Sequence, residues 1–392
     1  MKIALSFPGC HRRGGVERIV FECAGFLARQ GHEVHVLAAD WQEGLPSSVT
    51  MHRIDALRHP DFLHGYSYYR QSSAALTQMS FDVLATHGVV CPVGGVHWVQ
   101  SVHASWLARC RQFRPPWSLG RLRQQANPLH PILLRLEQRH FGERAYRKLI
   151  ATTPRVREDL QTFYQVPPQD VAIVPNGFNP DEFNPQRRHC HRDEQRKRLG
   201  LQDDQIAMLF VANELQRKGY RTILGAMRLL GRRDLRLLVV GKPDRKAVLG
   251  QAEEFGLVDQ VMAIGPTPAV ADYHAAADLF VLPTQYEAFS LAILESLGSG
   301  LPVVTSRIPG ADDAILPGIN GQVIEDPTSA EELAHALGST LNHAELERLS
   351  RQTAQTVEQY QWPRVLTRYS QILAQHADSS KGGSPELCAL SC

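Results

Sequence analysis

The sequence has no long apolar run. A helix that crosses a membrane needs roughly 18–20 consecutive apolar residues, and no stretch of the 392 residues reaches that length. The first seven residues are too short and too strand-like for a signal peptide. We therefore expect a cytoplasmic protein, for which attachment to the inner face of the cytoplasmic membrane would be peripheral.

Cysteine and excess charge are also scarce. The seven cysteines are scattered and lack the Cys-x-x-Cys spacing of metal sites, so we expect reduced thiols. The formal net charge is only +2, which argues against nucleic acid as a partner. A chain of 392 residues instead suits two α/β domains.

The first half begins with a βαβ pattern. Residues 2–7 are typical of a buried strand, residues 16–30 carry apolar side chains at helical spacing, and residues 33–38 form the next expected strand. This order predicts a parallel sheet. The loop before the helix contains Gly14-Gly15, which would let a ligand approach the backbone or simply form a turn. It does not match Gly-x-Gly-x-x-Gly, and this disfavours a nicotinamide cofactor.

The second half repeats strand and helix more regularly, which predicts a second doubly wound domain. Its expected strands are residues 207–212, 235–241, 261–265, 279–283, 303–305 and 322–324. Between the halves, turn-forming residues at 174–180 precede the charged stretch Arg187–Arg198. Turn formers followed by dense charge are typical of a hinge or linker.

The segment after the fourth of these strands predicts a ligand site. Glu287 lies in a polar loop, Ser290 suits a helix N-cap, and Glu295 falls about five residues into the helix. Ligands of such sheets bind beyond the carboxyl ends of the strands, so both carboxylates could face one crevice. Carboxylates accept hydrogen bonds from vicinal hydroxyls, and the N–H groups near residues 289–291 would attract a diphosphate. Two unrelated surface glutamates are the alternative.

Basic residues follow the first strand of the same domain. Arg217 and Lys218 precede Gly219, at the carboxyl end of that strand. Arginine can neutralise a diphosphate with two parallel hydrogen bonds. A pair of solvated surface cations is the other interpretation.

In the first half, His103 follows a short expected strand at residues 95–99 and could lie at its end, facing a cleft. A structural hydrogen-bonding role is the alternative, and His97 is the weaker candidate.

The segment 105–157 is basic and interleaved with apolar side chains. Its cations are Arg109, Arg111, Arg114, Arg121, Arg123, Arg135, Arg139, Arg144, Arg147, Lys148, Arg155 and Arg157. Basic residues alternating with tryptophan and leucine are what binding to an anionic lipid surface needs. A helical insertion with a solvated basic face would give the same composition.

Taken together, these motifs resemble the large retaining glycosyltransferase family that includes lipopolysaccharide-core glucosyltransferases, phosphatidylinositol mannosyltransferases and sucrose synthases. The resemblance covers nearly the full length and implies a GT-B fold, with two Rossmann-like domains facing across a cleft. It implies an acceptor-side domain over 1–178 with a basic insertion at about 104–147, and a donor-binding domain over 179–361. A helix at 362–378 would return to the first domain, and residues 379–392 look like a disordered tail.

The resemblance also implies roles for single residues. Arg217 and Lys218 would contact the diphosphate, Glu287 the transferred sugar, and Glu295 the ribose. The remaining donor-binding residues would be Gly15, Ala288, Phe289, Ser290 and Leu291. His103 would lie near the reacting sugar, so the expected catalytic residues are His103 and Glu287. The chain departs from the family at Asn213-Glu214, where Gly-Arg is common, and at Ala288 and Ser290, where glycines are usual.

The expected reaction moves a hexose from a nucleotide-diphosphate sugar, a UDP-sugar by resemblance, to a saccharide that is lipid-linked or part of a lipopolysaccharide core. The sequence contains no Asp-x-Asp motif of metal-dependent sugar transferases, so we expect neither metal nor cofactor. A GT-B sugar-nucleotide epimerase and a non-catalytic sugar-nucleotide-binding protein are the alternatives.

Overall fold

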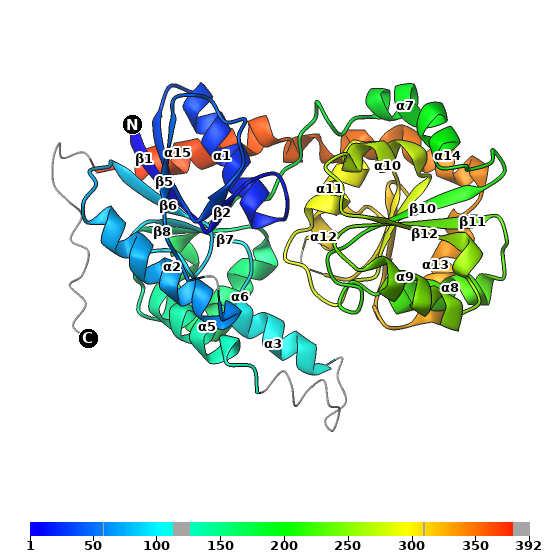
Figure 1. The fold of residues 1–392 in the computed structure, drawn as a ribbon, viewed down its shortest axis with the longest axis horizontal. Coiled ribbons are helices and arrows are strands. Elements are labelled where there is room, and N and C mark those ends of the chain that lie inside the picture. The colour runs from blue at the N-terminus through cyan, green and yellow to red at the C-terminus, as the bar shows by residue number, and fades with distance from the viewer. Residues whose placement is uncertain (58, 113–125, 309, 379–392) are drawn as a thin grey trace. The chain divides into compact units, whose positions relative to one another are not determined.

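The computed structural model describes residues 1–57, 59–112, 126–308 and 310–378. The chain divides into two compact units, each built on a parallel sheet (Figure 1). Unit 1 contains Met1–Asn176 and the chain from Pro363 on, and unit 2 contains Gly177–Trp362. The expected tail at 379–392 lies outside the described residues.

The sheet of unit 1 has seven parallel strands in the order β5-β3-β1-β6-β7-β8-β9. The strands are β1 (Lys2–Ser6), β3 (Glu33–Ala38), β5 (Val49–Arg53), β6 (Val83–Thr86), β7 (Val96–Val99), β8 (Lys148–Ala151) and β9 (Val171–Ile173). A separate short pair joins β2 (Gly9–Cys10) to β4 (Asp40–Trp41). The helices are α1 (Val16–Arg29), α2 (Asp61–Leu76), α3 (His103–Gln112), α5 (Leu129–Glu137), α6 (Pro154–Tyr164) and α15 (Trp362–Gln375).

Helix α15 packs in unit 1 although the chain reaches it only after unit 2. Tyr369 is fully buried there, with its ring 4.7 Å from that of Trp98, and its hydroxyl lies 3.2 Å from His87 Nε2. Beyond the helix, Asp378 accepts two hydrogen bonds from Arg147. The buried ring of Tyr369 and the half-buried Arg147–Asp378 pair hold the end of the described chain to unit 1.

The sheet of unit 2 has six parallel strands in the order β12-β11-β10-β13-β14-β15. They are β10 (Ile206–Val211), β11 (Leu235–Val240), β12 (Val261–Gly265), β13 (Leu279–Leu282), β14 (Val303–Ser306) and β15 (Gly321–Ile324). The helices are α7 (Pro185–Arg198), α8 (Tyr220–Leu230), α9 (Arg245–Glu254), α10 (Val270–Ala276), α11 (Leu291–Gly298), α12 (Ala311–Ala314), α13 (Ala330–Thr340) and α14 (His343–Thr353). In Figure 1, α7 and α10 lie on one face of this sheet, and α8, α9 and α13 lie on the other.

The central strands of unit 2 are apolar runs, interrupted only by Arg236 in β11, and they are buried on both faces, as parallel strands between helix layers require. Read in chain order, the six strands lie in the sequence 3-2-1-4-5-6, the order of a Rossmann fold. The chain winds one way from β10 and the other way from β13, which places the topological switch point between these two neighbours.

The expectation of a hinge or linker at Arg187–Arg198 was wrong. This stretch forms α7, which begins at Pro185 after the N-cap Asn184, whose side chain accepts a hydrogen bond from the Arg187 N–H. Three arginines four residues apart lie on one face of the helix: Arg188, Arg192 and Arg196. These charged side chains therefore attach α7 to the rest of unit 2 and do not form a solvated surface.

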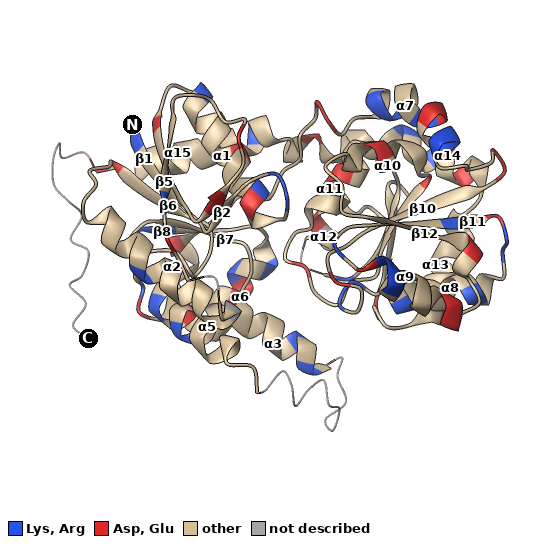
Figure 2. Ribbon diagram, viewed as in Figure 1, with Lys and Arg blue, Asp and Glu red and all other residues tan. Residues whose placement is uncertain are grey.

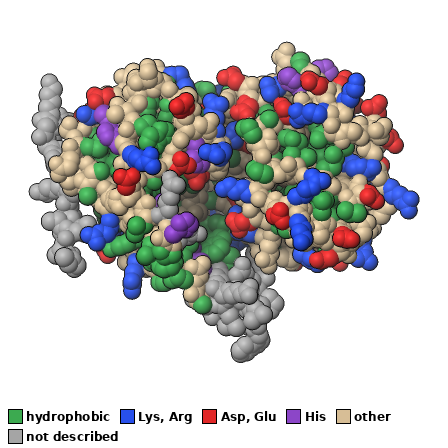
Figure 3. Space-filling model, viewed as in Figure 1, with side chains coloured by type: hydrophobic (Ala, Val, Ile, Leu, Met, Phe, Trp, Pro, Cys, Tyr) green, Lys and Arg blue, Asp and Glu red, His purple; other side chains and the backbone are tan. Residues whose placement is uncertain are grey.

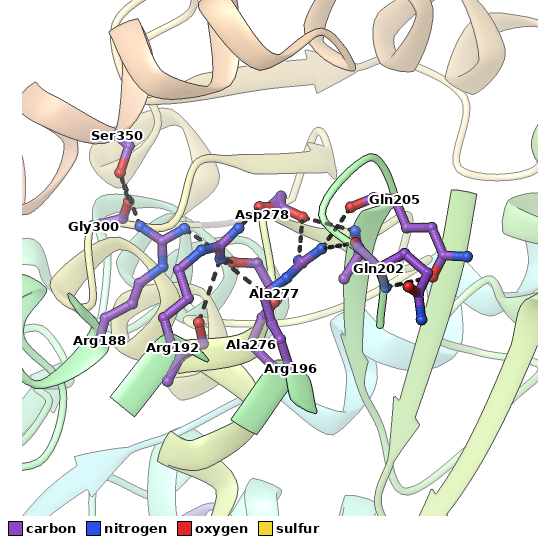
Figure 4. Close-up of polar contacts among 12 residues, drawn as sticks. Arg188, Arg192, Arg196, Gln202, Gln205, Ala276, Ala277, Asp278, Gly300 and Ser350 are labelled. Atoms are coloured by element: carbon purple, nitrogen blue, oxygen red, sulfur yellow. Dashed lines mark hydrogen bonds and ion pairs between the residues drawn. The ribbon is translucent and has the colours of Figure 1, made fainter. Parts of the chain in front are cut away.

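Figure 4 shows the contacts of this arginine face, and Asp278 is their centre. Arg196 Nη1 lies 3.2 Å from one Asp278 oxygen, which also accepts from the Ala207 N–H, and Arg192 contacts the other. Arg188 and Arg192 also donate to the carbonyl of Ala277, just beyond the last turn of α10. Cations at a helix C-terminus are favourable, and Asp278 neutralises part of the buried charge.

Candidate functional site

The predicted binding residues of unit 2 follow the two strands that flank the switch point. Arg217 and Lys218 come after β10, and Glu287 comes after β13. In open α/β sheets, ligands bind at the carboxyl ends of the strands where the winding direction reverses. Topology alone therefore brings these three residues to the place where a ligand is expected.

The three side chains contact one another. Arg217 Nη1 lies 3.1 Å from Glu287 Oε1, and the Lys218 amine contacts the same oxygen. Arg217 also pairs with Glu214, at 3.1 Å between Nη2 and Oε1. The side chains of Lys218, Glu287 and Arg217 are 12%, 19% and 23% exposed, whereas that of Glu214 is 60% exposed. Arg217 and Lys218 thus lie against two carboxylates, Glu214 and Glu287.

The loop after β10 is fixed to the loop after β13. Gly219 has a φ of +80°, and a Cβ atom at this position would lie 2.1 Å from the carbonyl oxygen of Pro283. Only glycine allows this approach. The Gln285 N–H donates to the Arg217 carbonyl, and Arg217 Nη1 donates to the Tyr286 carbonyl, at 2.9 and 2.7 Å. The cations are therefore held in place by backbone contacts as well as by carboxylates.

Burial lowers the pKa of the Lys218 amine to about 7. The positive charge of Arg217 acts in the same direction, and Glu214 opposes it. A dianionic ligand beside the amine would favour its charged form, because opposite charges in a half-buried site attract strongly. Binding of such a ligand would therefore be linked to protonation of Lys218.

The segment from Ala288 to Leu291 leads into α11. Ser290 is the N-cap residue, as expected, but its side chain makes no capping hydrogen bond. The side chain of Phe289 packs into the core of unit 2, with its ring edge-on to Tyr360. Glu295 is 4% exposed within the helix. What this segment can offer a ligand is thus mainly its backbone and the positive end of α11.

In unit 1, Gly15 and Gly14 lie before α1, as the sequence indicated. Gly15 is the N-cap residue, and a Cβ atom placed on it would meet no atom within 4 Å. The space beside this helix start is therefore open.

We expected His103 to lie at the end of a strand, but the structure places it elsewhere. Strand β7 ends at Val99, and His103 is the first residue of α3. The Glu137 carboxylate accepts hydrogen bonds from the N–H groups of His103 and Ala104 and from the Tyr164 hydroxyl. Burial lowers the pKa of the His103 imidazole to about 4, and His130 adds to this effect. The ring is therefore neutral at pH 7.

The weaker candidate, His97, has a structural role. It lies within β7, is 2% exposed, and its Nδ1 is 2.7 Å from the Thr86 hydroxyl on the neighbouring strand β6. This ring is part of the core of unit 1.

The basic segment is only partly described, because residues 113–125 are outside the described ranges. Some of its cations are engaged within unit 1: Arg147 pairs with Asp378, and Arg155 with Asp159. Arg111, Arg135 and Arg144 are exposed. Figure 2 shows basic residues on α3 and α5, and Figure 3 shows hydrophobic side chains gathered on the surface over α5, where residues 132–134 are half-buried.

Three residues of these sites were not predicted from the sequence: Glu214, His130 and Glu137. Glu214 was noted only as a departure from the family, although its spacing of three residues from Arg217 could have indicated the ion pair. His130 and Glu137 approach His103 from α5, about thirty residues away, and no local pattern reveals that contact.

Within the described residues, no group of three or more histidine, cysteine, aspartate or glutamate side chains is placed to hold a metal ion. In the same ranges, no helix is both long and apolar enough to span a membrane.

Two family models match the chain and together cover most of it. The model described as Glycosyltransferase Family 4 matches residues 13–182, and the model described as Glycosyl transferases group 1 matches residues 191–357. The chain is 26% identical to the lipopolysaccharide glucosyltransferase WaaG of Escherichia coli strain K12, over 85% of this chain and 87% of WaaG. It is 28% identical to the D-inositol 3-phosphate glycosyltransferase of Thermobispora bispora, over 94% and 91% of the two chains.

Solved structures share the fold. A crystal structure of WaaG, a glycosyltransferase involved in lipopolysaccharide biosynthesis, superimposes with a TM-score of 0.82 at 23% identity, over 95% of this chain and 99% of WaaG. The Anabaena HepE protein in complex with UDP-glucose superimposes with a TM-score of 0.71 at 15% identity, over 96% and 100%. The fold and both matched models define a glycosyltransferase of the GT-B class. The chain belongs to the glycosyltransferases that these two models describe, and it is related to WaaG and to the D-inositol 3-phosphate glycosyltransferases.

Proposed function

We propose that this glycosyltransferase moves a hexose from a UDP-sugar to a saccharide acceptor of a lipopolysaccharide core or a lipid-linked glycan, with retention of anomeric configuration. One observation carries the donor part of the proposal: Arg217, Lys218 and Glu287 meet at the switch point of unit 2. That the HepE structure contains UDP-glucose supports a uridine donor, and similarity to WaaG supports the acceptor class.

In the proposed reaction, Arg217 and Lys218 bind the diphosphate of the donor. The departing diphosphate gains negative charge as its bond to the sugar breaks, and fixed cations in a site with little water stabilise that charge. The N–H groups at the start of α11 add a positive partial charge without a metal ion. Loss of one such contact would raise the barrier by about 2–4 kcal/mol.

Binding of the donor requires an exchange of partners. The phosphate oxygens replace Glu287 at the two cations, and the released Glu287 carboxylate accepts hydrogen bonds from hydroxyls of the transferred sugar. Glu295 binds the ribose hydroxyls in this scheme. The acceptor oxygen then bonds to the anomeric carbon on the face that the phosphate leaves, and the leaving phosphate oxygen takes the proton of the acceptor hydroxyl.

Substitution of the two central residues tests the donor site. Lys218→Ala and Glu287→Ala should each abolish sugar transfer while circular dichroism shows an unchanged fold. Glu345→Gln is the control, because Glu345 forms an ion pair with Arg348 on α14, away from the switch point. Turnover near that of the unmodified enzyme in either variant would remove the residue from the site.

A thermal-shift series over nucleotide sugars identifies the donor. A ligand at a hundred times its Kd stabilises the folded protein by about 2.7 kcal/mol, so UDP-hexoses should raise the melting temperature and other nucleotide sugars should not. The anomeric configuration of the product, read by proton NMR, decides between retention and inversion.

The acceptor side of the proposal is peripheral attachment to an anionic membrane through the basic segment. Each well-placed cation adds roughly 1 kcal/mol of attraction to such a surface, and the apolar side chains over α5 would enter the interface. Flotation with vesicles containing anionic lipid at low salt should carry the protein upward. Arg111→Glu with Arg135→Glu should reduce flotation, and an absence of binding by the unmodified protein would refute attachment.

A further inference from the structure

The ring of His103 is held from two sides. Its Nε2 lies 3.1 Å from Nδ1 of His130 on α5, and its face is stacked on Trp106 of α3, with ring centroids 5.2 Å apart and planes at 20°. The His130 ring in turn lies 5.6 Å from that of Trp106. Three rings from two helices thus form one cluster in unit 1.

The backbone of His103 is fixed by the same helix. Glu137, the last residue of α5, is 1% exposed and accepts hydrogen bonds from the N–H groups of His103 and Ala104 at the start of α3. A carboxylate at a helix N-terminus is favourable, and the Tyr164 hydroxyl donates to one of its oxygens. Both the position of His103 and the direction of its ring therefore depend on α5.

The contact with His130 determines which nitrogen of His103 remains available. Nε2 of His103 is used by His130, and within the described residues Nδ1 of His103 makes no hydrogen bond. A neutral imidazole has one N–H donor and one bare acceptor. The Nε2–H tautomer is the intrinsically preferred form, and if both rings adopt it, His103 Nε2–H donates to the bare His130 Nδ1. The Nδ1 of His103 is then an acceptor.

We propose that His130 is a positioning residue that fixes His103 as the Nε2–H tautomer, so that His103 Nδ1 accepts a hydrogen bond from a hydroxyl of the sugar substrate. The contact with substrate rests on the proposed function. The pairing of the two rings does not, so the two parts can be tested separately.

The first test is spectroscopic. The protein contains 17 histidines, and the signals of His103 in a ¹⁵N-histidine sample are assigned by comparison with His103→Gln. Long-range proton–nitrogen spectra at pH 7.5 should show His103 with a protonated Nε2 and a bare Nδ1. His130→Phe keeps an aromatic ring but removes the acceptor, so that only the intrinsic preference for Nε2–H remains and a minor fraction of the Nδ1–H form should appear. His130→Asn places an amide oxygen near the lost Nδ1 and should retain the original tautomer.

An Nδ1–H tautomer in the unmodified protein, or signals of His103 that do not change in His130→Phe, would overturn the pairing. This result does not depend on activity, so it stands even if the proposed function fails.

The second test is kinetic. His130→Phe should lower kcat by about tenfold, the effect of losing one orienting hydrogen bond, with little change in KM for the donor, and His130→Asn should recover most of the rate. In the His103→Ala background, His130→Phe should have no further effect. A further tenfold loss in that background would show that His130 acts through the fold. Full activity of His103→Ala would refute the contact between His103 and substrate.

Discussion

Replacement of Glu214 by glutamine should strengthen donor binding. In the structure, Glu214 pairs with Arg217 through two hydrogen bonds of 3.1 and 3.2 Å. A diphosphate that binds Arg217 would lie near the Glu214 charge and compete with it for the guanidinium. Glutamine removes the charge and preserves the shape of the side chain.

The expected change in donor affinity follows from how exposed the two paired side chains are. Glu214 is 60% exposed and Arg217 is 23% exposed, and ion pairs this close to water contribute about 0.3–1 kcal/mol. Since 1.4 kcal/mol is a factor of ten, Kd for UDP should fall by about two- to fivefold. The gain should shrink at high salt, because exposed charges are screened.

Isothermal titration calorimetry with UDP measures the change. Glu345→Gln is again the matched control, because Glu345 and Arg348 form an exposed pair with the same three-residue spacing. Unchanged affinity in Glu214→Gln would show that Glu214 does not hold Arg217 back from the ligand. Weaker binding would show that Glu214 itself contacts the donor, and either result would refute the reasoning.

Three further predictions concern unit 2. UDP binding should weaken as the pH rises above 7 and should be accompanied by uptake of a fraction of a proton, because the lowered pKa of Lys218 leaves its amine partly neutral in the free protein. Calorimetry in two buffers of different ionisation enthalpy measures this proton uptake. The substitution Lys218→Arg should abolish it. Asp278→Asn should lower the free energy of unfolding in urea by about 3–5 kcal/mol, because it leaves buried arginines of α7 without their counter-ion, whereas Asp272→Asn, which affects more exposed pairs, should cost less than about 1 kcal/mol. Gly231→Ala should cost about 1–2 kcal/mol from its positive φ alone, and Gly219→Ala should cost more and also reduce transfer, because its Cβ would overlap the loop after β13.

The fold of unit 2 could be predicted well from local sequence. Each of its six strands lies within one residue of the predicted range, because parallel strands between helix layers are rich in apolar residues. The pattern of charged residues was less informative about the fold. The arginines of α7 were interpreted as part of a hinge or linker because their partner, Asp278, lies about eighty residues further along the chain.

The candidate site likewise contains some features that local sequence could predict and others that it could not. The clustering of Arg217, Lys218 and Glu287 could be predicted because each lies in the loop after one of two neighbouring parallel strands, whose carboxyl ends meet at one edge of the sheet. The carboxylate that holds Arg217 and the histidine that orients His103 depend on side-chain geometry between elements. For His103 itself, the helix start was missed because the capping carboxylate of Glu137 comes from another helix.

The two ends of unit 2 are joined by their backbones. The Phe178 N–H donates to the Tyr360 carbonyl and the Trp362 N–H to the Phe178 carbonyl, so the first and last residues of the unit lie together. Because unit 2 is also one uninterrupted stretch of chain, it is suited to excision as an independent polypeptide. Unit 1 has no such option, since it is assembled from both ends of the sequence. A fragment of residues 177–362 would retain the complete cation–carboxylate cluster, and under the proposed function it would be a minimal receptor for the nucleotide.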